Sequence, residues 1–431
     1  MTIYQHPKTE EWAEICARPH LDYTRLNNTV RDILADVRQG GDEAVKRYEA
    51  QFDHAQLDRL AVSEEEFDEA EQTVPEELKR AIRLAHRNIQ AFHATQLHQS
   101  DKVQVDEGVT CWRRMVPIDK VGLYVPGGTA PLFSTVLMLA TPAVIAGCPE
   151  VVLCTPPASD GRVNAAVLVA ARQAGVRRVF KAGGVQAIAA MAYGTESVPK
   201  VYKIFGPGNQ YVMAAKQQVS LADVAIDMPA GPSEVCVIAD ETANARFVAA
   251  DLLSQAEHGV DSQTLLITTS EQMLKQVQDE LAAQLEALPR REIARQAMEN
   301  SRLVVVSDTR EAMELANNYA PEHLIIQTED CHKLALQVRN AGSVFLGQWA
   351  CESAGDYASG TNHTLPTHGH AVSYGGVTVD SFCHSVTFQE LQPEGIAAIG
   401  PAVETMARAE GLDAHARAMT FRMEEIGVKN S

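Results

Sequence analysis

The feature that most constrains the fold is an alternation of short apolar runs with helical stretches, which begins near Val116. The runs of a first series each end in glycine or proline: VGLYVPGG, VVLCTPP, RVFKAGG, KIFGPG and AIDMPAGP. Such alternation is typical of a parallel sheet flanked by helices. In sheets of this kind ligands bind at the carboxyl ends of the strands, so the glycine turns are candidate binding elements.

A second series of apolar runs follows, again with helical stretches between them: EVCVIAD, TLLITTS, RLVVVSD, EHLIIQT and SVFLG. We therefore predict two α/β units, with the first inserted into the second. Beyond about Ser373 the pattern becomes helical, and helices are expected over Glu394 to Ala409 and Asp413 to Ile426. The predicted parts are a helical arm (1–25), an α/β domain carrying metal and catalytic residues (26–123 with 235–374), an inserted nucleotide-binding α/β domain (124–234) and a helical tail (375–431).

The composition limits the kinds of molecule that the protein can bind. A chain of 431 residues with a formal net charge of −19 repels nucleic acid and anionic membranes, which leaves a small molecule or another protein. The N-terminus has neither the basic start nor the apolar run of a signal peptide, and the eight cysteines form no CxxC pair. We therefore expect a cytoplasmic protein with reduced thiols. The apolar segment Pro131–Gly147 is short for a membrane span and contains Pro142, so it predicts a buried helix.

Two polar side chains in the segment DLLSQAEHGV favour a metal site. Apolar residues recur there at helical spacing, and Gly259 follows the expected end of the helix. Gln255 and His258 are three residues apart and therefore leave from one face. A carboxamide oxygen and an imidazole directed the same way can form half of a metal site. Alone, the same pair is more often made of ordinary surface or satisfied polar residues.

Glu322 and His323 stand next to each other directly before an apolar run. Both side chains can reach one crevice only if the backbone turns there, which Pro321 favours. An imidazole can take the proton of an alcohol, and a neighbouring carboxylate can activate water. A solvated turn is the alternative for an isolated Glu–His pair.

Two further clusters of ionisable residues follow. Asp356 and His363 lie in the stretch ESAGDYASGTNH, which is too irregular for packing and too short for a linker. Glu410 ends one helix of the tail, and His415 lies in the first turn of the next. Taken alone, each of these residues is more often a capping or surface residue.

Glycine turns indicate a nucleotide crevice, although the usual fingerprint GxGxxG is absent. Gly206–Gly208 (GPG) supplies only its first half, and Gly127–Gly128 and Gly183–Gly184 are doublets at strand ends. Glycine lets the backbone approach a phosphate, and the following helix N-terminus favours the negative charge. Each doublet alone fits a tight turn, whereas three on one unit favour a nucleotide site.

Several long runs together resemble the histidinol dehydrogenase family over nearly the whole chain: VGLYVPGGTAPLFSTVLMLATPA, KIFGPGN, DMPAGPSEV, DLLSQAEHG, PEHLI, SAGDYASGTNHTLPT and AEGLDAH. The resemblance implies two incomplete Rossmann-like domains in an aldehyde-dehydrogenase-like arrangement, with helical N- and C-terminal extensions exchanged in a homodimer. The chain departs from the family at Gly375, where Ser is frequent, and at Ala416 and Arg417, where Lys and Asn are common. None of these is a ligand position.

The resemblance also assigns roles to residues. One zinc ion per subunit would be held by Gln255, His258 and Asp356, together with His415 of the partner subunit. Tyr124, Gln186 and Asn209 would line the NAD site. Contacts to the substrate would come from Ser233, Gln255, His258, His323, Asp356 and His363, and from Glu410 of the partner subunit and His415 of the partner subunit.

The implied reaction converts L-histidinol to L-histidine through L-histidinal and reduces two NAD, as the last step of histidine biosynthesis. Zinc would bind the imidazole and the amine of the substrate and so position its carbinol carbon. His323 would act as the general base, and Glu322 would activate the water that hydrates the aldehyde. Four protein ligands and two substrate ligands exceed the usual tetrahedral number, so a loose or water-filled site is expected without substrate.

Four alternatives to this reaction differ in what they require. A covalent route through a thiohemiacetal is disfavoured, because Cys148 and Cys154 lie in apolar surroundings that raise a thiol pKa. A related NAD-dependent dehydrogenase of another polar alcohol would differ only in pocket residues. A zinc hydrolase would use the same ligands and Glu322 but leave the glycine turns without a role. A non-enzymatic metal-binding protein would need neither the Glu–His pair nor the crevice.

Overall fold

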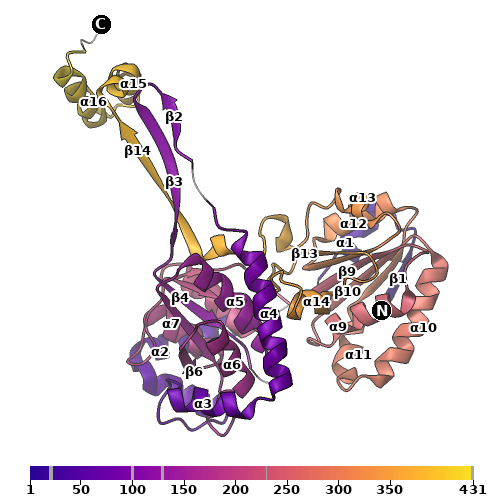
Figure 1. Ribbon diagram of the computed structural model, residues 1–431. Coiled ribbons are helices and arrows are strands. Elements are labelled where there is room, and N and C mark those ends of the chain that lie inside the picture. Colours follow the sequence, from indigo (N-terminus) through magenta and orange to yellow (C-terminus); the bar gives the residue numbers. More distant parts are fainter. Residues whose placement is uncertain (19–22, 99–100, 128–130, 230, 429–431) are drawn as a thin grey trace. The chain divides into compact units, whose positions relative to one another are not determined.

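The computed structural model describes residues 1–18, 23–98, 101–127, 131–229 and 231–428 (Figure 1). The chain divides into two compact units. The first consists of Met1–Gln96 and Ile118–Phe382, and the second of Leu97–Pro117 and Cys383–Ser431. Both predicted parallel sheets belong to the first unit, whereas the second unit contains an antiparallel sheet and the C-terminal helices.

A five-stranded parallel sheet is built from the first series of apolar runs. Its order is β6-β5-β4-β7-β8, so the strands are added outward in both directions from β4. This is the doubly wound order, in which the direction of winding reverses between β4 and β7. The strands are β4 (Lys120–Tyr124), β5 (Glu150–Thr155), β6 (Arg178–Lys181), β7 (Lys203–Phe205) and β8 (Ala225–Ile226).

Helices cover both faces of this sheet. Neighbouring strand residues such as Leu123 and Tyr124 point to opposite faces and belong to separate apolar cores. Helix α5 is buried, as predicted for the apolar segment, and α2 is interrupted at Gly41, which has a positive φ of 52°. One face packs against α3 (Glu64–Thr73), α4 (Glu76–Ala94), α5 (Phe133–Ala146) and α6 (Ala165–Gln173), and the other against α2 (Tyr23–Phe52), α7 (Gly184–Tyr193) and α8 (Gln210–Ser220).

The packing of residues 26–96 differs from the prediction, which grouped them with residues 235–374. Phe67 of α3 and Ile82 of α4 share a core with Leu123 of β4, and Val30 of α2 packs with the opposite face of the same sheet. The apolar stripe of a helix indicates that one face is buried, but it does not specify which sheet buries it.

A six-stranded parallel sheet contains the second series of runs. Its order is β1-β11-β10-β9-β12-β13, so the strands are again wound in both directions, here around β9. The strands are β9 (Glu234–Ala239), β10 (Gln263–Thr268), β11 (Arg302–Val305), β12 (His323–Gln327), β13 (Ser343–Leu346) and β1 (Thr2–Gln5). Helices α9 (Ala245–Ala256), α10 (Glu271–Ala287) and α11 (Arg291–Glu299) pack on one face, and α1 (Trp12–Ile15), α12 (Thr309–Tyr319) and α13 (Cys331–Ala335) on the other.

The N-terminal segment is part of this sheet and is not the helical arm predicted for residues 1–25. Strand β1 pairs in parallel with β11, and Trp12 and Ile15 are buried in the core beneath it. A strand of four residues carries too little alternation to be recognised from sequence, because its partner is about 300 residues away.

The second unit is an antiparallel sheet followed by two helices. Strand β14 (Cys383–Leu391) pairs with β3 (Val109–Pro117), which also pairs with β2 (Val103–Asp106). The predicted tail helices are confirmed as α15 (Pro393–Ala409) and α16 (Asp413–Glu425), but a strand replaces the helix predicted just beyond residue 375. Asp413 begins α16, and Leu412, not Asp413, is its N-cap.

The remaining described elements are short. They are α14 (Glu352–Tyr357) and three 3-10 turns, at Thr9–Glu11, His370–Val372 and Val379–Phe382. All eight cysteines are free thiols. Over the residues described, no helix has both the length and the apolar character needed to cross a membrane.

Candidate active site

The predicted Glu–His pair lies at the beginning of β12. Helix α12 ends at Tyr319, and Ala320 then adopts a left-handed conformation with φ 51°. This residue and Pro321 turn the chain from the helix into the strand. Glu322 and His323 are both buried, with 6% and 4% of their surface exposed. The turn therefore places both side chains inside the protein, which excludes the solvated turn for this pair.

The backbone of Glu234, at the start of β9, contacts both members of the pair. The Glu234 N–H donates to Glu322 Oε2 at 2.9 Å, and the Glu234 carbonyl oxygen lies 3.3 Å from His323 Nδ1. Because a carbonyl oxygen only accepts, this contact places the proton of the neutral ring on Nδ1. His323 Nε2 is buried and has no hydrogen-bond partner within the described part of the chain. It is therefore the nitrogen available to take a proton.

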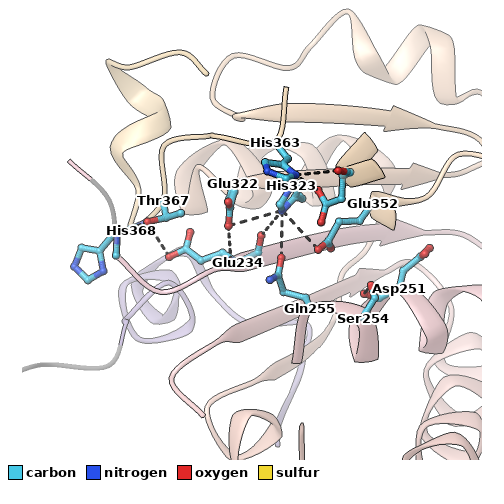
Figure 2. A network of polar contacts seen from close by, with 12 residues as sticks. Glu234, Asp251, Ser254, Gln255, Glu322, His323, Glu352, His363, Thr367 and His368 are labelled. Atoms are coloured by element: carbon cyan, nitrogen blue, oxygen red, sulfur yellow. Dashed lines mark hydrogen bonds and ion pairs between the residues drawn. The ribbon is translucent and has the colours of Figure 1, made fainter. Parts of the chain in front are cut away.

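Three carboxylates surround the His323 ring (Figure 2). Asp356 Oδ1 lies 3.7 Å from Nε2, while Glu322 Oε2 and Glu352 Oε1 lie 3.8 and 4.0 Å from Nδ1. Burial opposes a positive charge on the ring, but these carboxylates outweigh it and raise the pKa of His323 to about 10. Burial also raises the pKa of Glu322 to about 8. Burial thus controls the protonation of Glu322, and the nearby carboxylates control that of His323; perturbed pKa values of this kind are characteristic of acid–base sites.

A candidate metal-binding set lies beside this pair. His258 follows the end of α9 and is exposed, and α14 carries Glu352 and Asp356 one helical turn apart. One potential ligand atom from each of these three residues lies within 4.8 Å of the others. Imidazole nitrogen and carboxylate oxygen are donors that suit zinc. Glu352 was missed in the sequence, although its spacing of four residues from Asp356 was a signal that both share one helix face.

Gln255 reaches the same cluster from the last turn of α9 and is completely buried. Its Oε1 lies 3.2 Å from His323 Nδ1. In this orientation the Gln255 oxygen also faces Glu352 Oε1 and the Glu234 carbonyl oxygen, which are both acceptors. With the amide reversed, its nitrogen donates to these two oxygens at 3.2 and 3.1 Å and lies 3.2 Å from His323 Nδ1, so the reversed amide is the better satisfied one. Gln255 is thus brought to the predicted site.

His363 and Ser233 border the catalytic pair. His363 Nδ1 lies 2.9 Å from the backbone oxygen of Asp356, and burial lowers the pKa of the ring, so that it is neutral near pH 7. A cavity of about 100 Å³ is lined by Ser233, Glu322 and His363, among others. Two of the predicted substrate contacts, Ser233 and His363, therefore line one small cavity together with Glu322.

A larger cavity lies where the winding of the five-stranded sheet reverses. It has a volume of about 300 Å³ and is lined by Pro126 after β4, by Asn209 after β7, and by Ser233 and His258. In doubly wound sheets, nucleotides bind at the carboxyl ends of the strands at this point. The nucleotide crevice that the fold predicts therefore adjoins residues of the metal and substrate cluster.

The other two predicted nucleotide contacts are buried and have protein partners. The Tyr124 hydroxyl accepts the Gly184 N–H at 3.1 Å, and Gln186 Nε2 donates to Glu49 Oε1 at 2.7 Å. Asn209 caps α8 and at the same time lines the larger cavity. The roles of all three in binding NAD stay predictions. The second glycine of the predicted doublet Gly127–Gly128 lies outside the described residues.

Glu410 and His415 belong to the second unit. Glu410 is the C-cap of α15, His415 lies in the first turn of α16, and both are exposed to solvent. Their participation in an active site, and the exchange of segments in a dimer, stay predictions.

The fold and the site together define a class: an α/β enzyme with two doubly wound sheets, a buried Glu–His pair, a candidate metal-binding set and a cavity at the point where the winding of one sheet reverses. The family model for histidinol dehydrogenase matches residues 16–423. The chain therefore belongs to the histidinol dehydrogenase family.

Named relatives agree with this assignment. The histidinol dehydrogenase of Bacteroides fragilis (strain ATCC 25285) is 63% identical over 426 residues, covering 99% of this chain and 100% of the relative. That of Escherichia coli (strain K12) is 50% identical over 420 residues, covering 97% and 96%. The crystal structure of histidinol dehydrogenase from Elizabethkingia anophelis is similar with a TM-score of 0.97 at 50% identity, covering 99% of this chain and 98% of that one.

An acetylating aldehyde dehydrogenase from Geobacillus thermoglucosidasius is similar at a TM-score of only 0.46 and 15% identity. The aldehyde-dehydrogenase-like arrangement therefore stays a prediction, while two parallel α/β sheets are established.

Proposed function

We propose that the protein oxidises L-histidinol to L-histidine through L-histidinal, with zinc bound and two NAD reduced, as a cytoplasmic enzyme of histidine biosynthesis. Membership of the histidinol dehydrogenase family supports this activity. The observation that carries the proposal is the cavity shared by Asn209, Ser233 and His258. Oxidation by NAD requires the nicotinamide and the substrate to lie side by side. This cavity extends from Asn209, in the turn after β7, to Ser233 and His258, which are candidate substrate and metal contacts.

The crevice has room for a dinucleotide. The cavity of about 300 Å³ shares Pro126 with a neighbouring cavity of about 590 Å³ at the carboxyl ends of β4 and β5. Gly206 has φ 128°, and a Cβ there would lie 2.0 Å from the Tyr124 carbonyl oxygen. Only glycine therefore allows the chain after β7 to pass so close to the end of β4.

The donor set of this chain fits zinc. His258 and Asp356 supply a nitrogen and a carboxylate oxygen within 4.8 Å of each other, and the amide of Gln255 lies in the same cluster. We propose these three as ligands, with His415 of the partner subunit as the fourth. When bound, zinc would hold the amine and imidazole of the substrate and would offset the negative charge that raises the pKa of His323.

His323 takes the alcohol proton in the first oxidation. Its Nδ1 is held by the Glu234 carbonyl, so the lone pair of the neutral ring is on Nε2. As a hydride leaves the carbinol carbon, the hydroxyl proton moves to this nitrogen and the aldehyde forms.

Glu322 acts in the second oxidation, which needs an aldehyde hydrate. One oxygen of its carboxyl group accepts the Glu234 N–H, and the side chain lines the small polar cavity. A cavity of about 100 Å³ can hold water. Glu322 takes a proton from that water as the water attacks the aldehyde carbon, and His323 returns the proton from the first oxidation to the carbonyl oxygen. The hydrate then gives up a hydride, for which the second NAD would be the acceptor, while His323 takes a hydroxyl proton. The resulting acid ionises to the carboxylate of histidine.

Two contacts are proposed to come from the second unit of the partner subunit. Glu410 and His415 are both exposed in this chain, so their side chains are accessible to another subunit. A carboxylate at position 410 suits the amine end of L-histidinol, and an imidazole at position 415 suits zinc. This proposal makes the active enzyme a homodimer.

The decisive experiment measures NADH formed from L-histidinol before and after zinc is removed with a chelator. The expected result is two NADH per histidinol, lost on removal of zinc and recovered when zinc is restored. Glu322→Gln should retain formation of the aldehyde but lose the second NADH, because only the second step needs activated water. A folded, zinc-loaded dimer that forms no NADH would contradict the assignment and favour another polar alcohol as substrate.

A further inference from the structure

We propose that Arg18 and Glu234 are positioning residues for the catalytic pair. In this arrangement Arg18 anchors the side chain of Glu234, and the backbone of Glu234 orients Glu322 and fixes the tautomer of His323. The inference rests on the proposed function, because it takes Glu322 and His323 as the groups that move protons.

The Glu234 side chain is held at both oxygens. The guanidinium of Arg18 donates Nε–H to Oε1 and Nη2–H to Oε2, the latter at 3.0 Å, and the His368 N–H donates to Oε1 at 3.1 Å. Only 2% of the Glu234 side chain and 13% of the Arg18 side chain are exposed. A buried carboxylate bound by two parallel N–H groups of one guanidinium edge has a single favourable orientation.

Arg18 is itself fixed from two directions. Its Nη2 also donates to the Tyr319 carbonyl oxygen at 2.6 Å, and its guanidinium lies 4.4 Å from the centre of the Tyr319 ring. Tyr319 ends α12, directly before the turn that leads to Glu322. Arg18 therefore links the start of β9 with the end of the helix that precedes the catalytic pair.

The backbone of Glu234 conveys this anchoring to the pair. Its N–H binds Glu322 Oε2 at 2.9 Å, which leaves the second oxygen of that carboxyl group to act on water. Its carbonyl oxygen, 3.3 Å from His323 Nδ1, keeps the lone pair of the ring on Nε2. A shift of β9 at this residue would therefore misplace both groups together. Misplacement of reacting groups by about 1 Å costs on the order of 100-fold in rate.

The test compares Arg18→Met with the wild type, both loaded with zinc and saturated with NAD. The kcat is expected to fall on the order of 100-fold for both L-histidinol and L-histidinal. KM, the Kd for histidinol and the zinc content should stay within about threefold, because the ligands for substrate and metal remain in place. Guanidinium ion added to Arg18→Ala should restore part of the kcat. Arg295→Met, which removes an exposed arginine of α11, is the matched control and should leave all these values unchanged.

Two milder variants test the same inference if Arg18→Met does not fold. Arg18→Lys keeps the charge but not the fork, and Glu234→Gln keeps the shape of the side chain; both should lower kcat by about tenfold. Ring ¹⁵N NMR of His323 in the zinc-loaded protein, assigned with His323→Asn and recorded at a pH where the ring is neutral, reports the Nδ1–H tautomer without substrate, and this tautomer should be lost in Arg18→Lys. A wild type that is inactive on histidinol would contradict the proposed function, whereas the NMR result tests the positioning role separately. Unchanged kcat and an unchanged tautomer in these folded variants would overturn the inference.

Discussion

Asp251 links the helix that carries Gln255 to the strand that begins with His323. It lies in α9 with 7% of its surface exposed, and its Oδ2 accepts a hydrogen bond from Gln327 Nε2 at 2.8 Å at the end of β12. Burial raises its pKa to about 7, more than the hydrogen bond from Gln327 lowers it. The carboxyl group therefore takes up a proton on folding at pH values where the unfolded chain is ionised.

The sign and size of the effect follow from the two pKa values. An acid whose pKa is raised by folding stabilises the folded state at low pH, and this contribution declines from about pH 4 and is lost above about pH 7. The difference between a folded pKa of about 7 and an unfolded value near 4 corresponds to about 4 kcal/mol in all. Between pH 5 and pH 8 the decline amounts to about two pKa units, or about 3 kcal/mol.

Asp251→Asn removes this titration while keeping an oxygen that accepts from Gln327. The free energy of unfolding of the wild type should therefore fall by about 3 kcal/mol relative to the variant between pH 5 and pH 8. Urea unfolding, followed by the fluorescence of the buried Trp12 in the same half of the unit, measures this difference. Titrations elsewhere in the chain are common to both proteins and cancel.

Asp279→Asn, at an exposed position of α10, is the matched control for loss of one carboxylate. If the difference between wild type and Asp251→Asn were the same at pH 5 and pH 8, the buried carboxyl group would have no raised pKa. The reasoning from burial would then be refuted.

Three further changes have expected outcomes. Gly206→Ala should abolish NAD binding in a calorimetric titration, because the added Cβ would lie 2.0 Å from the Tyr124 carbonyl oxygen; normal binding would contradict the close approach. Lys216→Met should lower the free energy of unfolding by about 3–5 kcal/mol, because Asp227 loses its ion-pair partner where both side chains are at most 2% exposed. Adding Asp227→Asn should recover part of that loss, and no recovery would exclude the pair as its cause. Glu352→Gln should weaken zinc binding about 10–100-fold in competition with a chelator, and unchanged affinity would exclude Glu352 from supporting the metal.

The strands were predictable because their signal is local. Runs such as VVLCTPP and EHLIIQT are apolar over the length of a strand and end in turn residues, and both series form parallel strands in the structure. The burial of both Glu322 and His323 was also predictable, because two ionisable residues directly before a buried strand can both reach one crevice when the backbone turns there. Pro321 gave the reason why both side chains turn inward.

The packing partners were not predictable, because they join residues far apart in sequence. The pairing of β1 with β11 and the packing of Phe67 on β4 depend on contacts that no local period encodes. The same holds for Arg18 and Glu234, which are 216 residues apart. Arg18 belongs to none of the motifs, and Glu234 lies in the run DMPAGPSEV without a role assigned to it. Only the structure reveals that the backbone of Glu234 touches both Glu322 and His323.

The two sheets are wound in the same way, but the candidate functional residues lie at the carboxyl ends of the strands in one sheet and at the amino ends in the other. The cavity proposed for the nucleotide lies at the carboxyl ends of β4 and β7, where doubly wound sheets bind ligands. Glu234 and His323 instead begin β9 and β12, so the proposed acid–base groups lie at the amino ends of the second sheet. Proton transfer requires side chains in fixed positions, and the first residues of central strands are more rigid than loops. In the proposed function, one sheet would therefore supply a glycine-rich crevice for the exchangeable NAD, and the other would supply the rigid groups that move protons.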